Sequence, residues 1–161
     1  MKQLILVRHA KSSWDAPLRD FDRPLTNKGI HDAHLVSSNI SNQVPKSFIV
    51  WSSAAKRASE TAVIFAQNIS FPVESIVFKD DLYTFDERKL EEIIKSCPDD
   101  YDNLIVFGHN EAITNFVNKF GNILIDNVST SGFVKINFEN SDWNSIEKGT
   151  TKKVILPRDL K

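Results

Sequence analysis

Short apolar runs alternate along the chain with amphipathic stretches of helical spacing. Apolar runs at 3–7 and 103–107 predict buried strands, and 48–51 predicts a further short strand. A fourth run, at 75–78, is a candidate strand at an edge of the sheet. The stretches between them predict helices at 26–39, from residue 53 onward, at 87–95 and at 111–119. This alternation predicts an α/β fold, a three-layer α/β/α sandwich around a mostly parallel sheet.

The last third of the chain has a different pattern. Phe133, Ile136 and Phe138 lie in a run that alternates imperfectly, and residues 143–147 could pair with it. We therefore expect an antiparallel C-terminal addition to the sheet. The lysines at the end, Lys152, Lys153 and Lys161, are expected to form a solvated tail. We find no repeat and no linker, so residues 1–161 are expected to form one domain.

Composition narrows the class of protein. The 161 residues are 41% hydrophobic and 25% charged, as in soluble globular proteins. A net charge of −1 provides no overall field that would attract nucleic acid or a membrane surface. No apolar stretch is long enough to cross a bilayer, and the short apolar start is interrupted by Arg8. The only cysteine, Cys97, cannot form an internal disulfide, and this favours a cytoplasmic location. Cys97 itself is expected at a helix end.

Charged residues follow three of the predicted elements at the same kind of position. Arg8 and His9 end the first strand, Arg57 follows the second, and Gly108-His109 end the run at 103–107. Because the carboxyl ends of parallel strands meet at one crevice, these side chains should form a cationic pocket. Guanidinium groups match phosphate oxygens in geometry and charge. The pattern predicts a phosphate site with His9 as a candidate nucleophile.

Four sequence blocks carry a family resemblance. They are Leu-Val-Arg-His-Ala at 6–10, Arg-Pro-Leu-Thr-Asn-Lys-Gly at 23–29, Ser-Ala-Ala-Lys-Arg-Ala-Ser-Glu-Thr-Ala at 53–62 and Gly-His-Asn at 108–110. In type and order they resemble the histidine phosphatases of the phosphoglycerate mutase-like superfamily, most closely the short SixA-like phosphohistidine phosphatase branch. The resemblance implies that this chain folds and works as they do.

The resemblance also implies roles for individual residues. His9 would accept the phosphoryl group, while Arg8, Arg57 and a protonated His109 would hold its oxygens. Ser12 stands where many relatives place another phosphate donor. No metal or other cofactor is implied, because the cationic side chains can supply the charge stabilisation. His9 would need a neutral ring, with its second nitrogen bonded to an acceptor such as a backbone carbonyl.

One position departs from the wider family. Acid-dependent members carry a glutamate near mid-chain that protonates the leaving oxygen, and Thr84 stands at that place here. An alkoxide leaving group is more basic than imidazole by about 9 pKa units, or about 12 kcal/mol of proton affinity. The absence of that glutamate therefore favours phosphohistidine or aryl esters, although Asp20, Asp22 or Glu87 could replace it as the acid.

Three functions remain open from the sequence. The first is a phosphatase for phosphohistidine in a protein, such as a histidine phosphotransfer domain; the second is a phosphatase for small phosphomonoesters. The third is a phosphate-binding module without turnover.

Several single residues have a structural interpretation as well as a functional one. Arg23 either stabilises its loop or adds charge near the phosphate. Trp14 and Trp51 are interpreted as packing residues rather than as a platform for substrate. The pair His31 and His34 is interpreted as a helix face, since two ligands without a third do not make a metal site.

Overall fold

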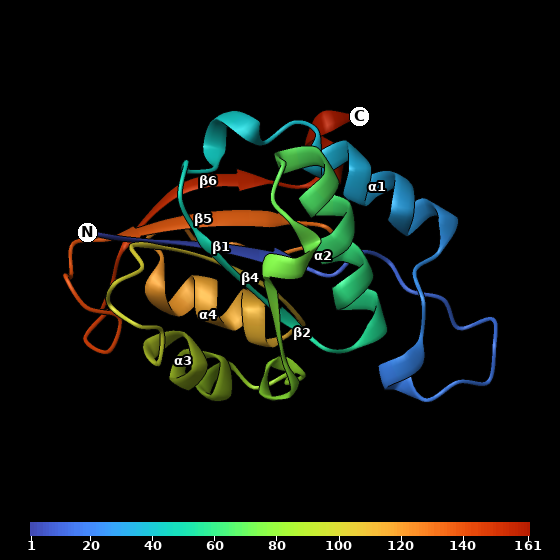
Figure 1. The fold of residues 1–161 in the computed structure, drawn as a ribbon, viewed down its shortest axis with the longest axis horizontal. Helices are drawn as coiled ribbons and strands as arrows, with labels where there is room; N and C mark the ends of the chain where they lie inside the picture. The colour runs from blue at the N-terminus through green and yellow to red at the C-terminus, as the bar shows by residue number, and fades with distance from the viewer.

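A computed structural model describes all 161 residues, from Met1 to Lys161, as a mixed sheet with helices on both faces (Figure 1). The strands are β1 (Lys2–Arg8), β2 (Ile49–Ser53), β3 (Ile76–Lys79), β4 (Asn103–Gly108), β5 (Phe133–Phe138) and β6 (Thr150–Ile155). The helices are α1 (Asn27–Ser37), α2 (Lys56–Ile69), α3 (Glu87–Lys95) and α4 (Ala112–Phe120).

The six strands lie in the order β3-β2-β4-β1-β5-β6. The first four run parallel to one another, β5 runs antiparallel to β1, and β6 runs antiparallel to β5. The predicted α/β sandwich with a mostly parallel sheet and an antiparallel C-terminal addition is therefore confirmed.

Strand β1 lies between two hydrophobic layers. Leu4 and Leu6 pack with the residues of α3 and α4, whereas Ile5 and Val7 pack with those of α1 and α2. Successive side chains of a strand point to opposite faces, so a strand covered on both sides is apolar at every position. This explains the continuous apolar run of β1. The packing on both faces holds β1 in place, and His9 follows directly after its last residue.

The predicted partner of β5 is wrong. The antiparallel partner is β6 at Thr150–Ile155, not 143–147. Trp143 is fully buried instead, and its indole Nε1 donates a hydrogen bond to the Tyr101 carbonyl at 2.7 Å. The expectation of a solvated tail is also wrong for Lys152 and Lys153, because both lie within β6. Their side chains are exposed, which suits an edge strand.

Two helix boundaries also differ from the prediction. Helix α2 begins at Lys56 rather than at residue 53, because β2 continues through Ser53 before the chain turns. Helix α1 ends at Ser37 rather than at residue 39. The predicted N-cap is confirmed, since the Thr26 hydroxyl accepts a hydrogen bond from the Gly29 N–H at 2.9 Å.

The start of α1 lies tightly against the loop that follows His9. The Thr26 N–H donates to the Lys11 carbonyl at 2.9 Å, and a Cβ atom at Gly29 would overlap with that same carbonyl group. Only glycine permits this approach, which holds the segment carrying Lys11 and Ser12 in place.

Replacing Gly29 with alanine is expected to destabilise the protein, although alanine favours helices. The steric overlap involves backbone atoms and should cost about 1–3 kcal/mol, more than the gain of about 1 kcal/mol in helix propensity. Chemical denaturation would show a lower unfolding midpoint for Gly29→Ala, with Lys28→Ala on the same helix turn as the control. An unchanged or raised midpoint for Gly29→Ala would contradict this account of the helix start.

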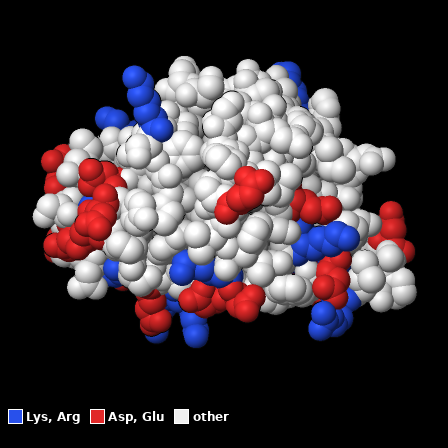
Figure 2. All heavy atoms as spheres, viewed as in Figure 1, with Lys and Arg blue, Asp and Glu red and all other residues white.

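No helix in the structure combines the length and the apolar character needed to cross a bilayer. On the face shown in Figure 2, basic and acidic side chains lie interspersed and do not gather by sign into one large patch. Charge that matters for ligand binding must therefore be sought in the local arrangement of side chains.

Candidate active site

Three neighbouring strands deliver their charged residues to one edge of the sheet. Arg8, the last residue of β1, is paired in register with Gly108, the last residue of β4, and His9 and His109 follow them directly. Strand β2 lies on the other side of β4, and Arg57 follows it in the first turn of α2. The structure thus brings the four predicted residues together around one site.

A cavity of about 370 Å³ opens at this edge. It is lined by Arg8, His9, Lys11, Ser12, Trp14, Asp20, Arg23, Arg57, Phe85 and Thr130. His109 lies behind this lining and is almost completely buried, with its ring centroid 5.2 Å from that of His9.

The hydrogen bonds of His9 fix its tautomer. Nδ1 lies 2.7 Å from the carbonyl oxygen of Ala10, which can only accept, so Nδ1 carries the proton of the neutral ring. Nε2 therefore carries a lone pair and no proton, and the Arg57 Nε–H donates to it at 3.3 Å. Burial above all, with the nearby Arg57, Arg8 and Arg23 charges, lowers the pKa of His9 to about 4. The ring is neutral at physiological pH, as a nucleophile requires.

Arg57 is buried and makes three directed contacts. Besides the bond to His9, Nη1 donates to the Asp20 carbonyl at 2.6 Å and Nη2 to the Asp20 carboxylate at 2.9 Å. Its guanidinium plane is thus held at a fixed angle beside the His9 nitrogen. Arg57 does not lie at the surface, and Glu60, three residues further along α2, accepts the Leu25 N–H.

Asp20 connects two of the three guanidinium groups of the cavity, those of Arg23 and Arg57. Its carboxylate accepts hydrogen bonds from Arg57, from Arg23 and from the Tyr83 hydroxyl, which lies 2.5 Å away. Burial alone would raise the pKa of Asp20, but the three hydrogen bonds outweigh it and lower this pKa far below its usual range. Asp20 is therefore ionised and balances part of the positive charge.

Arg23 contributes charge to the cavity as well as support to its loop. Its Nη1 donates to the Ser12 hydroxyl at 2.6 Å and to the Ser13 carbonyl at 3.2 Å. The Ser12 hydroxyl lies at the cavity, already bonded to a cation. The structure thus supports both interpretations of Arg23, as a residue that stabilises its loop and as a charge near the phosphate cavity.

His109 is held by a serine at the end of β2. Its Nε2 lies 2.8 Å from the Ser53 hydroxyl, while its Nδ1 has no hydrogen-bond partner. Burial, and then the neighbouring His9 and Arg57, lower the pKa of His109 to about 3. Without a bound anion this ring is therefore neutral and carries one proton, whereas the expectation of a protonated His109 concerns the phosphate-bound site and stays a prediction.

Two buried nitrogen atoms of this cluster are unpaired. Arg8 donates from Nη1 to the Val128 carbonyl at 2.9 Å, but its Nε–H has no acceptor, and Nδ1 of His109 has no hydrogen-bond partner. An unpaired buried polar group costs about 1–3 kcal/mol. Both groups belong to residues that the sequence predicted to hold phosphate oxygens, which are strong acceptors.

A family comparison agrees with this geometry. Residues 4–124 match the family described as the histidine phosphatase superfamily, branch 1. This chain belongs to the histidine phosphatase superfamily. Among curated proteins it is similar to an uncharacterized chloroplastic protein of Arabidopsis thaliana, with 34% identity over 119 residues, 68% of this chain and 55% of that protein.

A second curated relative is a Yersinia pestis protein named as a probable phosphoglycerate mutase. The identity is 42% over 69 residues, 41% of this chain and 31% of that protein. The chain thus spans from just under a third to about half of the length of these curated relatives.

Solved structures share the fold over the whole chain. The protein histidine phosphatase SixA, complexed with tungstate, superposes with a TM-score of 0.82 at 20% identity, covering 99% of both chains. A mycobacterial glucosyl-3-phosphoglycerate phosphatase superposes with a TM-score of 0.64 at 11% identity, covering 96% of both. Both superpositions show a shared fold.

The three candidate acids lie in different surroundings. Asp20 is at the cavity but is ionised. Asp22 pairs with the exposed Arg19 at 2.8 Å, and Glu87 lies 3.6 Å from Lys119 of α4. Thr84 caps a turn by accepting the Asp86 N–H at 3.2 Å. Of the three acids only Asp20 lines the cavity, and it has no proton to donate.

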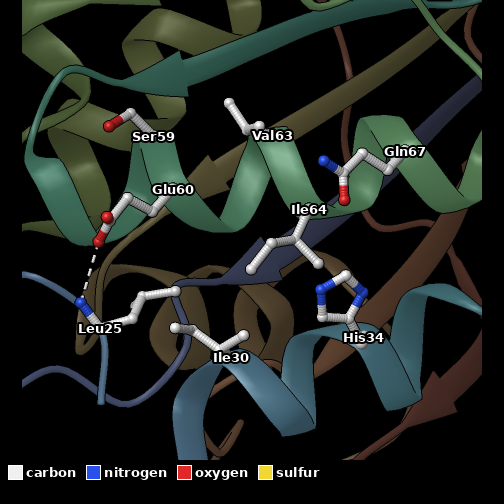
Figure 3. Close-up of a pocket in the computed structure, with 8 residues that line it drawn as sticks. All are labelled: Leu25, Ile30, His34, Ser59, Glu60, Val63, Ile64 and Gln67. Carbon is white, nitrogen blue, oxygen red and sulfur yellow. Dashed lines mark hydrogen bonds between the residues drawn. The ribbon is translucent and has the colours of Figure 1, made fainter. Parts of the chain in front are cut away.

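Another cavity, of about 380 Å³, lies between α1 and α2 (Figure 3). Ile30 and His34 of α1 face Ile64 of α2 across it, and Glu60 bonds to the Leu25 N–H at one end. It has no lysine or arginine, so it does not suit a phosphate. His34 belongs to this groove and contacts Asn68, and His31 is not among its lining residues.

Sequence reasoning missed several residues around the phosphate cavity. Ser53 holds His109, and the Thr61 hydroxyl accepts the Ala10 N–H at 2.9 Å. Tyr83 reaches Asp20, and Phe85 lies on the cavity wall. Ser53 and Thr61 both lie within the third family block, which was a usable signal. Tyr83 and Phe85 flank Thr84, but nothing in their own pattern marks them.

The two buried imidazoles make the stability of this protein depend on pH. Their folded-state pKa values, about 4 and about 3, lie below the ordinary value of 6.5. The unfolded chain therefore binds more protons between pH 6.5 and about 4, and stability present above pH 6.5 is lost as the pH falls through this window. Each ring can add at most about 1.4 kcal/mol per pH unit to this slope.

Chemical denaturation at pH 7, 6 and 5 would measure this slope. We expect a shallower decline in unfolding free energy for His9→Asn than for the wild type. Gln67→Ala, at an exposed residue of α2 that does not line the phosphate cavity, serves as the control and should keep the wild-type slope. Identical slopes for the wild type and His9→Asn would show that His9 is not buried as a neutral ring.

Proposed function

We propose that this chain is a phosphatase that transfers a phosphoryl group to His9 and then to water, and that its substrate is phosphohistidine in a protein. The observation that carries this proposal is the state of His9. Its Nδ1–H is bonded to a backbone carbonyl, and its neutral Nε2 lies against a buried guanidinium in a cavity open to solvent.

The first step is an in-line displacement. The Nε2 lone pair of His9 forms a bond to phosphorus while the bond from phosphorus to the leaving group breaks and its electron pair stays with the leaving group. Positive charge develops on the His9 ring, and the Nδ1–H bond to Ala10 stabilises it. Arg8 and Arg57 stabilise the negative charge on the phosphoryl oxygens, with Nδ1 of His109 as a further donor.

The second step returns His9 to its starting state. Water attacks the phosphorus of phospho-His9, the P–N bond breaks with its electron pair returning to Nε2, and the water proton leaves to solvent or to the phosphate. The same guanidinium groups serve both displacements. No step needs a metal ion, because the charge on phosphate is met by the side chains of this chain.

The choice of phosphohistidine rests on the missing acid. Asp20 is the one carboxylate in the cavity lining, and its low pKa leaves it without a proton to donate. Imidazole can leave from a P–N bond and take its proton from water near neutral pH, whereas an alkoxide needs an acid. A protein as the carrier fits the exposed mouth of the site, which is bordered only by the short segments around Trp14 and Phe85.

Two measurements test the proposal. Brief mixing with a labelled phosphohistidine protein should leave acid-labile, base-stable phosphate on His9. Rates on that protein should then exceed those on an alkyl phosphate. Faster hydrolysis of the alkyl phosphate would favour a phosphatase for small phosphomonoesters. Binding of phosphate without turnover of either substrate would favour a phosphate-binding module.

A further inference from the structure

The cavity at His9 has two chemically different parts. Eight of its ten lining residues are polar or charged, and the two that are not, Trp14 and Phe85, are both aromatic. Trp14 is 75% exposed and Phe85 is 52% exposed, although large aromatic rings are usually buried. The interpretation of Trp14 as a packing residue is therefore wrong, whereas Trp51 is buried as expected.

Both rings are held in place despite their exposure. The Arg23 guanidinium lies over the Trp14 ring, 3.4 Å from its centroid, and Arg23 is itself fixed by Ser12 and Asp20. Phe85 meets the rings of Tyr83 and His109 edge-on, each with a centroid distance of 5.6 Å. Because these contacts order the rings in advance, a ligand that packs on them loses little further conformational entropy.

We infer that Trp14 and Phe85 form a subsite for the leaving group and favour a flat aromatic ring such as the imidazole of phosphohistidine. This inference rests on the proposed phosphatase activity and adds the residues that determine specificity. The guanidinium groups and His9 take the phosphoryl group, and the rest of the substrate must lie at the mouth of the cavity. The two aromatic rings are the apolar surfaces available there.

The contacts between rings should be worth a measurable but moderate factor. Packing of one aromatic ring on another contributes about a twofold to tenfold effect in affinity. These contacts act on the ring of the leaving group and not on the phosphoryl group, so a substrate with the same P–N bond and no ring should lose nothing. Phosphoramidate is such a substrate, since its P–N bond breaks to release ammonia in place of imidazole.

The experiment compares free phosphohistidine with phosphoramidate in the wild type, Phe85→Ala and Trp14→Ala. The control for Phe85 is Phe78→Ala, because Phe78 is 46% exposed on β3 and does not line the cavity. Leu18→Ala is the control for Trp14 on the same loop. We expect kcat/KM for phosphohistidine to fall about threefold to tenfold in each cavity variant, with phosphoramidate hydrolysis and both controls unchanged.

The outcomes separate the subsite from the activity itself. If the wild type hydrolyses both compounds and the cavity variants match it on phosphohistidine, the subsite is wrong and the phosphatase activity stands. An equal loss on both compounds also overturns the subsite, because it would mean that the aromatic rings support Arg23 or His109 and not the leaving group. A wild type inactive on both compounds overturns the proposed function and the subsite with it.

Discussion

Replacing His9 with alanine should abolish phosphatase turnover, with a loss on the order of 10⁴-fold or more in kcat. The lone pair at Nε2 is the one nucleophile that lies against the Arg57 guanidinium, so no neighbouring group can take its place in the first displacement. Hydrolysis of para-nitrophenyl phosphate measures this directly, because its leaving group needs no acid.

Anion binding provides the control for this variant. The Arg8 and Arg57 side chains stay in place in His9→Ala, so tungstate or inorganic phosphate should still bind. Turnover equal to that of the wild type would reject His9 as the nucleophile. Loss of anion binding together with turnover would instead indicate that the variant has lost the arrangement of the cavity.

Replacing Arg57 with alanine should lower kcat/KM by about 10²–10³-fold, as expected when a donor to a developing oxyanion is removed. The variant loses the bond to His9 and leaves the Asp20 carboxylate facing the cavity without one of its two arginine partners. Arg57→Lys should recover only part of the loss, since an ammonium group cannot reproduce the planar fork of donors.

Arg19 provides a matched control for Arg57. Arg57 pairs with Asp20, and Arg19 pairs with Asp22 of the same short segment. Unlike Arg57, the Arg19 side chain is exposed to solvent. Arg19→Ala should therefore leave kcat/KM unchanged, since exposed ion pairs contribute little. A similar loss in both variants would mean that the segment 19–22 is sensitive to any change, and that the effect at Arg57 is not specific to the phosphoryl group.

The elements that could be predicted from the sequence are those whose burial leaves a regular apolar pattern. The continuous apolar run of β1 follows from packing against two layers, and the helical spacing in α2 follows from packing one face against the sheet. The edge strand β6 could not be recognised, because one of its faces is exposed and its lysines are typical of a solvated end. Trp143 looked like part of a strand because burial of an aromatic ring does not itself reveal the element that carries it.

The positions of the site residues were predictable where a strand end fixes them. His9 and His109 follow β1 and β4 directly, so parallel pairing decides their proximity. The network around Asp20 was not predictable, since it depends on how the loop from Ser12 to Leu25 folds back over α2. Asp20 looked like a possible acid in the sequence, and only its contacts with Arg57, Arg23 and Tyr83 show that it is an anion.

The Asp20 carboxylate has a consequence for how tightly anions are held in the cavity. Each nitrogen of the Arg57 guanidinium already donates one hydrogen bond within the chain, so orthophosphate competes with a carboxylate that cannot diffuse away. A tethered group of this kind competes at an effective concentration in the millimolar range. Orthophosphate should therefore be held only weakly, and a substrate with a second point of contact should be held more tightly than the bare anion.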